Sequence, residues 1–177
     1  FKKINNLRTH GITRKKNEMI NPINQPWYYQ QIDLGYNYRM TDIQAALGVS
    51  QMKKVDKFVE SRNKIAKRYD KYLSDLPMQL PTISNDCYSS FHLYIIRLKH
   101  QNSAKLRNKL YHTLLAEKIY TNIHYIPIHT QPYYKKMKSK FNDLIESEKY
   151  FDDALSIPIF PKLKKQDQNK IIYLIKQ

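Results

Sequence analysis

Apolar side chains recur at steps of three and four residues from Thr41 to about Leu73, while lysine and aspartate fill the opposite face. This periodicity predicts a long amphipathic helix. A helix of more than about 30 residues is long for a globular domain, so we expect a bend or a break within it. Thr41 and Gln44 have the spacing of a capping box, which marks the start of the helix.

The second half of the chain alternates between extended and helical patterns. Residues 90–98 and 119–124 are rich in aromatic and β-branched side chains and are predicted strands. Between them, Ser103 is predicted to cap a helix that runs to about Glu117. Its inner face would carry Leu106, Leu110, Leu114 and Leu115. A short helix over residues 146–155, an apolar strand or connector over 156–161 and a final helix from about Lys165 complete an α/β unit.

The N-terminal segment has weaker patterns. Residues 1–12 predict a short helix that Gly11 stops, with His10 in its last turn. Residues 13–34 are polar, contain two prolines and are predicted to form a long connection. Within it, Trp27, Tyr28 and Tyr29 form an aromatic cluster, which either packs on a core or forms a binding wall; the sequence leaves both open.

Composition narrows the classes of protein. A chain of 177 residues fits one domain, or one small domain and a piece of another. Its three glycines form neither a Walker loop nor a GxGxxG motif. Cys87 is the single cysteine, which excludes an internal disulfide and favours a cytoplasmic location. No run of 18 apolar residues occurs, so no membrane span is expected. Because Phe1 is not a start methionine, the chain looks like the C-terminal part of something longer.

The net charge of +16 suggests a second class of function, a basic module that binds nucleic acid or another polyanion. The excess is mostly lysine and is spread along the whole chain, outside any recognisable DNA- or RNA-binding motif. We therefore expect no specific nucleic-acid partner.

Two stretches carry candidate chemistry. Tyr36, Asn37 and Arg39 stand just ahead of the predicted helix N-terminus, where free N–H groups favour an anion; an ordinary capped helix is the alternative. His124 and His129 lie in a segment broken by prolines, predicted to be a strand end that runs into a rigid loop. That loop is either a binding wall or a surface turn, and no third ligand nearby supports a metal site.

Four blocks occur here in an order that resembles the DegT/DnrJ/EryC-type sugar aminotransferases, which are enzymes dependent on pyridoxal 5'-phosphate (PLP). The blocks are PWYY at residues 26–29, GYNYRMTDIQAA at 35–46, NIHYIPIHTQPYY at 122–134 and LSIPIFP at 155–161. The resemblance covers essentially the whole chain. It implies the C-terminal part of the aspartate-aminotransferase architecture (PLP fold type I). Residues 1–76 would be the end of the large domain with a long connecting helix, and residues 77–177 the small α/β domain.

The resemblance also implies an activity. The intact enzyme would transfer an amino group, probably from glutamate, to C4 of a UDP-linked 4-keto-6-deoxy-N-acetylhexosamine, as in pseudaminic acid synthesis. Perosamine and bacillosamine aminotransferases share most of the same blocks and are the alternatives within the family, as is a sensory or degenerate member.

Site residues follow by the same match. Asn37, with Tyr36 and Arg39 nearby, would contact the PLP phosphate of the partner subunit in a homodimer. His124, Tyr125 and His129 would line the wall over the sugar nucleotide. The lysine that forms the Schiff base with PLP is expected upstream of Phe1, so no catalytic residue is assigned, and the chain by itself is predicted to be inactive.

Overall fold

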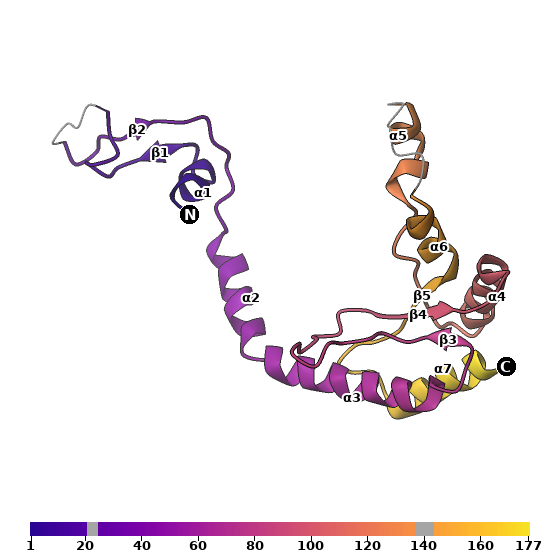
Figure 1. Ribbon diagram of the computed structural model, residues 1–177. Coiled ribbons are helices and arrows are strands. Elements are labelled where there is room, and N and C mark those ends of the chain that lie inside the picture. The colour runs from indigo at the N-terminus through magenta and orange to yellow at the C-terminus, as the bar shows by residue number, and fades with distance from the viewer. Residues whose placement is uncertain (21–24, 137–143) are drawn as a thin grey trace. The chain divides into compact units, whose positions relative to one another are not determined.

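A computed structural model describes residues 1–20, 25–136 and 144–177. The chain divides into two compact units, residues 1–53 and residues 54–177, and each is considered by itself (Figure 1). Residues 21–24, within the predicted connection over 13–34, lie outside the described residues. None of the described helices is long and apolar enough to cross a membrane.

In the first unit, the described residues form two helices and one small β ribbon. Helix α1 spans Lys2–Leu7, and helix α2 spans Asp42–Met52. Between them, strand β1 (Ile12–Thr13) pairs antiparallel with strand β2 (Gln30–Gln31). Strands β1 and β2 lie at the two ends of the segment that the sequence predicted to be a long connection.

Two glycines bring the backbone of this unit together. A Cβ added to Gly35 would lie 2.2 Å from the backbone nitrogen of Gly11, so only glycine permits the approach. Gly11 has a φ of +69°, a left-handed conformation that glycine adopts readily. The short N-terminal helix was predicted correctly, but His10 does not lie in its last turn. The helix ends at Leu7, and His10 stands in the following turn with a φ of 65°.

The second unit is built on a three-stranded antiparallel sheet in the order β3-β4-β5. Strand β4 (Tyr94–Leu98) is central, and the side chains of β5 (Ala154–Ile157) are all buried. Strand β3 (Met78–Gln79) forms the other edge. In the register, Tyr94 lies opposite Ile157 and Met78 opposite Leu98.

The described residues of this unit also form helices. They are α3 (Val55–Leu73), α4 (Ser103–Ala116), the 3-10 turn η1 (Ile128–Thr130), α5 (Pro132–Lys136), α6 (Ile145–Asp153) and α7 (Lys165–Lys176). Of these helices, α4 and α6 contact the sheet. Helices α3 and α7 run side by side (Figure 1). Helices and sheet share one apolar core: Ile65, Ala66, Tyr69, Leu73, Tyr94, Ile96, Leu114, Leu155, Ile157, Ile159, Ile171 and Ile172.

Two buried tyrosines in this core have satisfied hydroxyl groups. Tyr69 donates to the carbonyl of Pro158 (2.9 Å), and Tyr94 donates to the carboxylate of Asp70. Burial raises the pKa of both tyrosines well above the usual range, and the neighbouring carboxylate raises that of Tyr94 further. Both side chains therefore stay protonated in the folded protein at neutral pH.

Several predicted elements are confirmed and others are corrected. The long helix is broken, as expected, between Met52 and Val55. The strand predicted over residues 119–124 is wrong, because only Asn122 forms an isolated bridge, to Ser156. The helix predicted from Ser103 is present, but its N-cap is Asn102.

The inner face of α4 also differs from the predicted leucine stripe. Leu114 is buried, whereas Leu106 and Leu115 are exposed. Arg107 is buried instead, and its guanidinium donates to the carbonyl of Phe151 in the last turn of α6. The face that α4 buries depends on the element packed against it. Here that element is the C-terminal end of α6, whose last carbonyl groups have no hydrogen-bond donor within their own helix.

Candidate functional site

The loop before α2 is built against the turn that follows α1. Thr9 and Asn37 form an isolated antiparallel bridge. The amide of Tyr38 donates to the carbonyl of Arg8 (2.9 Å). Backbone contacts therefore fix the course of this loop.

The loop leads directly into a capped helix. Thr41 Oγ1 accepts from the amide of Gln44 (3.3 Å), and the side chain of Gln44 accepts from the amide of Thr41 (3.0 Å), so the predicted capping box is confirmed. Residues 36–39 thus precede a helix N-terminus, where unpaired N–H groups and the helix dipole favour a negative charge.

Side chains on this loop fall into two kinds. The rings of Tyr36 and Tyr38 stack on each other, with centroids 5.1 Å apart and planes 9° apart. Within the described part of the chain, the side chains of Asn37 and Arg39 have no hydrogen-bond or ion-pair partner. An amide and a guanidinium without internal partners are donors available to a phosphate or a carboxylate.

Arg39 also lines a cavity of about 580 Å³ within the first unit. The other lining residues are Thr9, Ile12, Arg14 and Tyr29. The guanidinium of Arg14 lies 5.9 Å from the centre of the Tyr29 ring. Two arginines and an aromatic face suit an anionic ligand with a flat group. Tyr29 therefore fits the binding-wall alternative for the aromatic cluster; Trp27 and Tyr29 are both exposed, but only Tyr29 lines this cavity.

A second candidate wall is the loop over residues 122–131, in the second unit. It begins beside β5, where the backbones of Asn122 and Ser156 exchange hydrogen bonds of 3.1 and 2.8 Å. It turns at η1, where Thr130 Oγ1 donates to the carbonyl of Pro127 (2.7 Å). Tyr125 lies between these points and is 73% exposed, so it is the ring that the loop presents to solvent.

Both histidines of this loop bind other elements. His124 Nδ1 lies 2.7 Å from Ser156 Oγ on β5. His129 Nε2 lies 2.8 Å from Glu148 Oε1 on α6. The ring of His124 also stands edge-on to that of Tyr125, with centroids 4.7 Å apart.

The predicted site residues therefore form two groups. Tyr36, Asn37 and Arg39 are neighbours on one loop of the first unit. His124, Tyr125 and His129 share one loop of the second unit. Among the described residues, no cluster of three or more His, Cys, Asp or Glu side chains is placed to hold a metal ion.

Three residues with a place in these sites were not singled out from the sequence. They are Arg14 in the cavity, Ser156 beneath His124 and Glu148 beside His129. Arg14 is one of 31 basic residues, so it gives no local signal. Ser156 and Glu148 meet their histidines across 32 and 19 positions of sequence, which no local pattern reveals.

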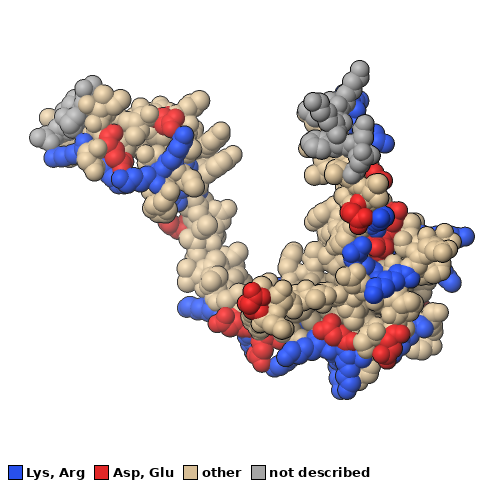
Figure 2. Space-filling view, in the orientation of Figure 1, with Lys and Arg blue, Asp and Glu red and all other residues tan. Residues whose placement is uncertain are grey.

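Charge is distributed without a continuous basic face in the view of Figure 2. Lys and Arg are mixed with Asp and Glu over the surface drawn. Ion pairs such as Lys64–Glu60 (2.6 Å) and Lys170–Glu117 (2.6 Å) account for part of this mixing. The face drawn therefore shows no basic groove of the kind that binds nucleic acid.

Comparison with known proteins places these motifs in one family. The model of the DegT/DnrJ/EryC1/StrS aminotransferase family matches residues 1–176. An uncharacterised protein of Methanocaldococcus jannaschii, MJ1066, is 33% identical over 99% of this chain and 46% of its own length. The UDP-4-amino-4,6-dideoxy-N-acetyl-beta-L-altrosamine transaminase of Campylobacter jejuni is 34% identical over 93% of this chain and 41% of its own length.

Solved structures agree on the fold. PseC of Helicobacter pylori, an aminotransferase involved in the biosynthesis of pseudaminic acid, superimposes with a TM-score of 0.83 at 26% identity, over 99% of this chain and 44% of its own. The PLP form of the putative sugar aminotransferase Spr1654 of Streptococcus pneumoniae gives 0.84 at 26% identity, over 99% of this chain and 42% of its own. The chain thus has the fold of part of a type I PLP enzyme, and it spans less than half the length of the relatives that it matches.

Proposed function

Because the chain belongs to the DegT/DnrJ/EryC1/StrS aminotransferase family, we propose that it forms part of a PLP-dependent aminotransferase that acts on a nucleotide sugar. The observation that carries this proposal is the loop of residues 36–39. It combines a capped helix N-terminus with two donor side chains that have no partner among the described residues.

These residues fit the phosphate end of PLP. Asn37 offers an amide donor and Arg39 a guanidinium, both exposed, and the N-terminus of α2 adds a favourable dipole. When bound, PLP supplies the electron sink for amino transfer, while the protein supplies binding and orientation. On the family match, Asn37 serves the cofactor of the partner subunit in a homodimer, with Tyr36 beside it.

No lysine of the described residues is assigned to carry the cofactor. The proposal therefore requires a lysine in a segment that precedes Phe1 in the working protein. Residues 1–76 would belong with that segment as the end of the large domain, and residues 77–177 would form the small domain. The apolar side chains exposed on α2, such as Ile43 and Leu47, would be covered by that large domain.

The nucleotide sugar would lie against the loop that carries His124, Tyr125 and His129. We propose a UDP-linked 4-keto-6-deoxy-N-acetylhexosamine as the acceptor, in synthesis of a pseudaminic acid-type sugar, and glutamate as the amino donor. Support comes from the names of the Campylobacter jejuni relative and of PseC.

The test uses the protein in which this chain is joined to a lysine-bearing N-terminal segment. With PLP, glutamate and the 4-keto sugar nucleotide, we expect amino transfer, detected as the mass change of the sugar nucleotide. Asn37→Ala should weaken PLP binding by roughly tenfold or more, since it removes a hydrogen bond to a charged group.

The matched control is Asn85→Ala, which removes an exposed asparagine of the second unit that has no side-chain partner among the described residues. It should leave PLP binding unchanged. Failure of the lysine-bearing protein to bind PLP would overturn the assignment of the cofactor. Equal PLP affinity of Asn37→Ala and the unmodified protein would overturn the role of this loop.

A further inference from the structure

The two ends of the histidine loop, residues 122–131, are fastened by different elements. At the first end, the amide of Ile123 donates to Asn122 Oδ1 (2.8 Å), which turns Asn122 Nδ2 toward His124 Nε2 (3.2 Å). An amide NH2 only donates, so His124 Nε2 accepts and the ring proton lies on Nδ1. His124 Nδ1–H then donates to Ser156 Oγ (2.7 Å).

Both ring nitrogens of His124 are therefore used within the protein. Ser156 is nearly fully buried on β5, and its backbone already pairs with Asn122. The hydroxyl thus stands on a fixed strand and sets the orientation of the ring. The ring of His124 in turn lies edge-on to that of Tyr125, which remains exposed beside it.

At the second end of the loop, Glu148 fixes the ring of His129, as Ser156 fixes that of His124. A carboxylate only accepts, so His129 Nε2 carries the proton of their 2.8 Å hydrogen bond. The His129 side chain is 13% exposed, whereas that of Glu148 is 55% exposed. The contact therefore holds the largely buried side chain of His129 against α6, while the side chain of Glu148 stays exposed to solvent.

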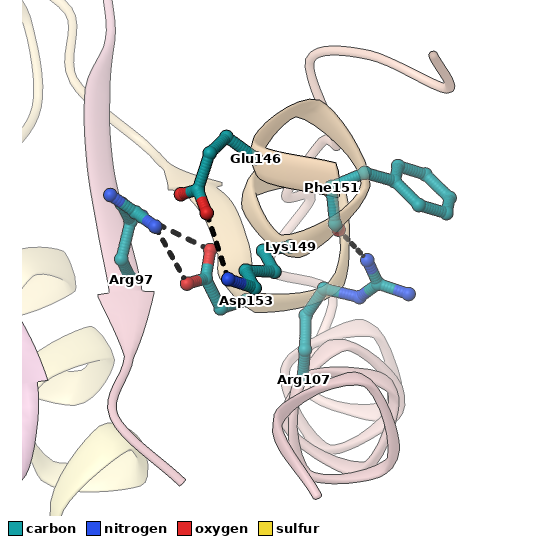
Figure 3. A network of polar contacts seen from close by, with 6 residues as sticks. All are labelled: Arg97, Arg107, Glu146, Lys149, Phe151 and Asp153. Carbon is teal, nitrogen blue, oxygen red and sulfur yellow. Dashed lines mark hydrogen bonds and ion pairs between the residues drawn. The ribbon is translucent and has the colours of Figure 1, made fainter. Parts of the chain in front are cut away.

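Helix α6 is itself anchored at its C-terminal end (Figure 3). Arg97 of β4 holds Asp153 through two hydrogen bonds, of 3.1 and 2.9 Å. Arg107 of α4 donates to the carbonyl of Phe151 and lies over its ring. Cations at a helix C-terminus are favourable. Glu148 is thus carried by a helix that both the sheet and α4 hold in place.

We propose that Ser156 and Glu148 are positioning residues, which fix the rings of His124 and His129 and thereby hold the loop in the form that presents Tyr125 to the nucleotide sugar. The proposal rests on the proposed function for the identity of the ligand. It assigns the two histidines to holding the loop and gives the contact with ligand to Tyr125.

The experiment compares Ser156→Ala, Glu148→Ala and Glu148→Gln in the protein joined to its lysine-bearing segment. Each alanine should raise KM for the nucleotide sugar about threefold to tenfold, the effect of one lost hydrogen bond, with kcat within about twofold. Glu148→Gln should restore most of the affinity, since its Oε1 still accepts from His129. Glu146→Ala is the matched control, because Glu146 lies on the same helix but pairs with Lys149, and it should leave KM unchanged.

Imidazole nitrogen NMR on histidine-labelled protein gives a readout that does not depend on substrate. We expect a protonated Nδ1 at His124 and a protonated Nε2 at His129, and a loss of each preference in the corresponding alanine variant. Spectra of the unmodified protein that lack these tautomers would overturn the proposal. So would alanine variants that lose the tautomer preference but keep an unchanged KM. If the expected tautomers are present in a protein that does not bind the UDP-linked 4-keto-6-deoxy-N-acetylhexosamine, the proposed function is overturned and the anchoring of the loop remains.

Discussion

Residues 1–53 and residues 54–177 have similar shares of apolar side chains in their helices but use them differently. In the second unit, Tyr69, Leu73 and Ile96 are completely buried. In the first, Leu34 and Ile43 are each 84% exposed, and helix α2 buries no residue at all. The second unit therefore holds its shape by packing, and the first holds its shape by backbone contacts.

This difference in burial indicates the source of stability in each unit. An apolar core stabilises in proportion to the area that it removes from water. The described residues of the first unit, 1–20 and 25–53, form no such core. They are held by the close approach of Gly11 and Gly35, the pairing of Thr9 with Asn37 and the cap of α2. Such a unit presents apolar side chains to another surface, as the proposed large domain would provide.

The sharpest test of the comparison removes one leucine from each unit. Leu73→Ala should lower the free energy of unfolding by about 2–5 kcal/mol, because it leaves a cavity in a packed core. Leu47→Ala, on exposed α2, should change it by less than about 0.5 kcal/mol in the 177-residue chain. Urea unfolding followed by circular dichroism measures both, and equal losses would mean that the first unit has a core of its own.

A second test adds a methyl group to each of two glycines of the first unit. Gly35→Ala should destabilise its local structure by about 1–3 kcal/mol, since the new Cβ would meet backbone atoms of Gly11 and Leu7. Gly48→Ala is the control, because nothing lies within 4 Å and alanine favours helix. Hydrogen exchange at the amides of Tyr36 and Tyr38 reports the result. Unchanged protection in Gly35→Ala would contradict the close approach.

A third test uses alkaline pH, to which the core of the second unit should respond. Unfolding returns Tyr69 and Tyr94 to a pKa near 10.0, whereas burial raises both in the folded state. Stability from these groups is complete below about pH 10 and falls as pH rises further, by about 1.4 kcal/mol per pH unit for each tyrosine. Tyr69→Phe should remove part of this slope, and Tyr120→Phe, an exposed tyrosine, should not.

The smallest expected effect concerns the cap of α2. Thr41→Ala should cost about 1 kcal/mol of helix stability, because it removes the acceptor for the amide of Gln44. Thr41→Ser keeps the hydroxyl and should restore most of it. Faster hydrogen exchange at Gln44 in the alanine variant alone is the expected result. If the serine variant exchanges equally fast, the loss does not come from the hydroxyl.

Features with local causes could be predicted from the sequence. The capping box at Thr41, the break in the long helix and the start of α7 at Lys165 depend on neighbouring residues, and all are present. The α/β fold class is confirmed. The family is confirmed as well; it was inferred from four sequence motifs that occur in the same order as in its members.

Features that depend on distant partners could not be predicted. The β-forming side chains of residues 119–124 indicated a strand, yet Asn122 alone in this segment forms a β-bridge, to Ser156. The ribbon of β1 and β2 is two residues long on each side and includes polar glutamines, so no alternation marks it. In the candidate site, Asn37 and His124 were predicted from sequence motifs. Ser156 and Glu148 were identified only from their contacts with the two histidines in the structure.

Helix α6 passes into β5 without a connecting residue, since the helix ends at Asp153 and the strand begins at Ala154. One inserted residue at this junction would turn the helix by about 100° relative to the strand or exchange the two faces of the strand. Glu148 and Ser156 would then lose their common register. The number of residues between Glu148 and Ser156 is therefore constrained. Insertions should be tolerated better in the turn between Phe160 and Lys165 than between Asp153 and Ala154.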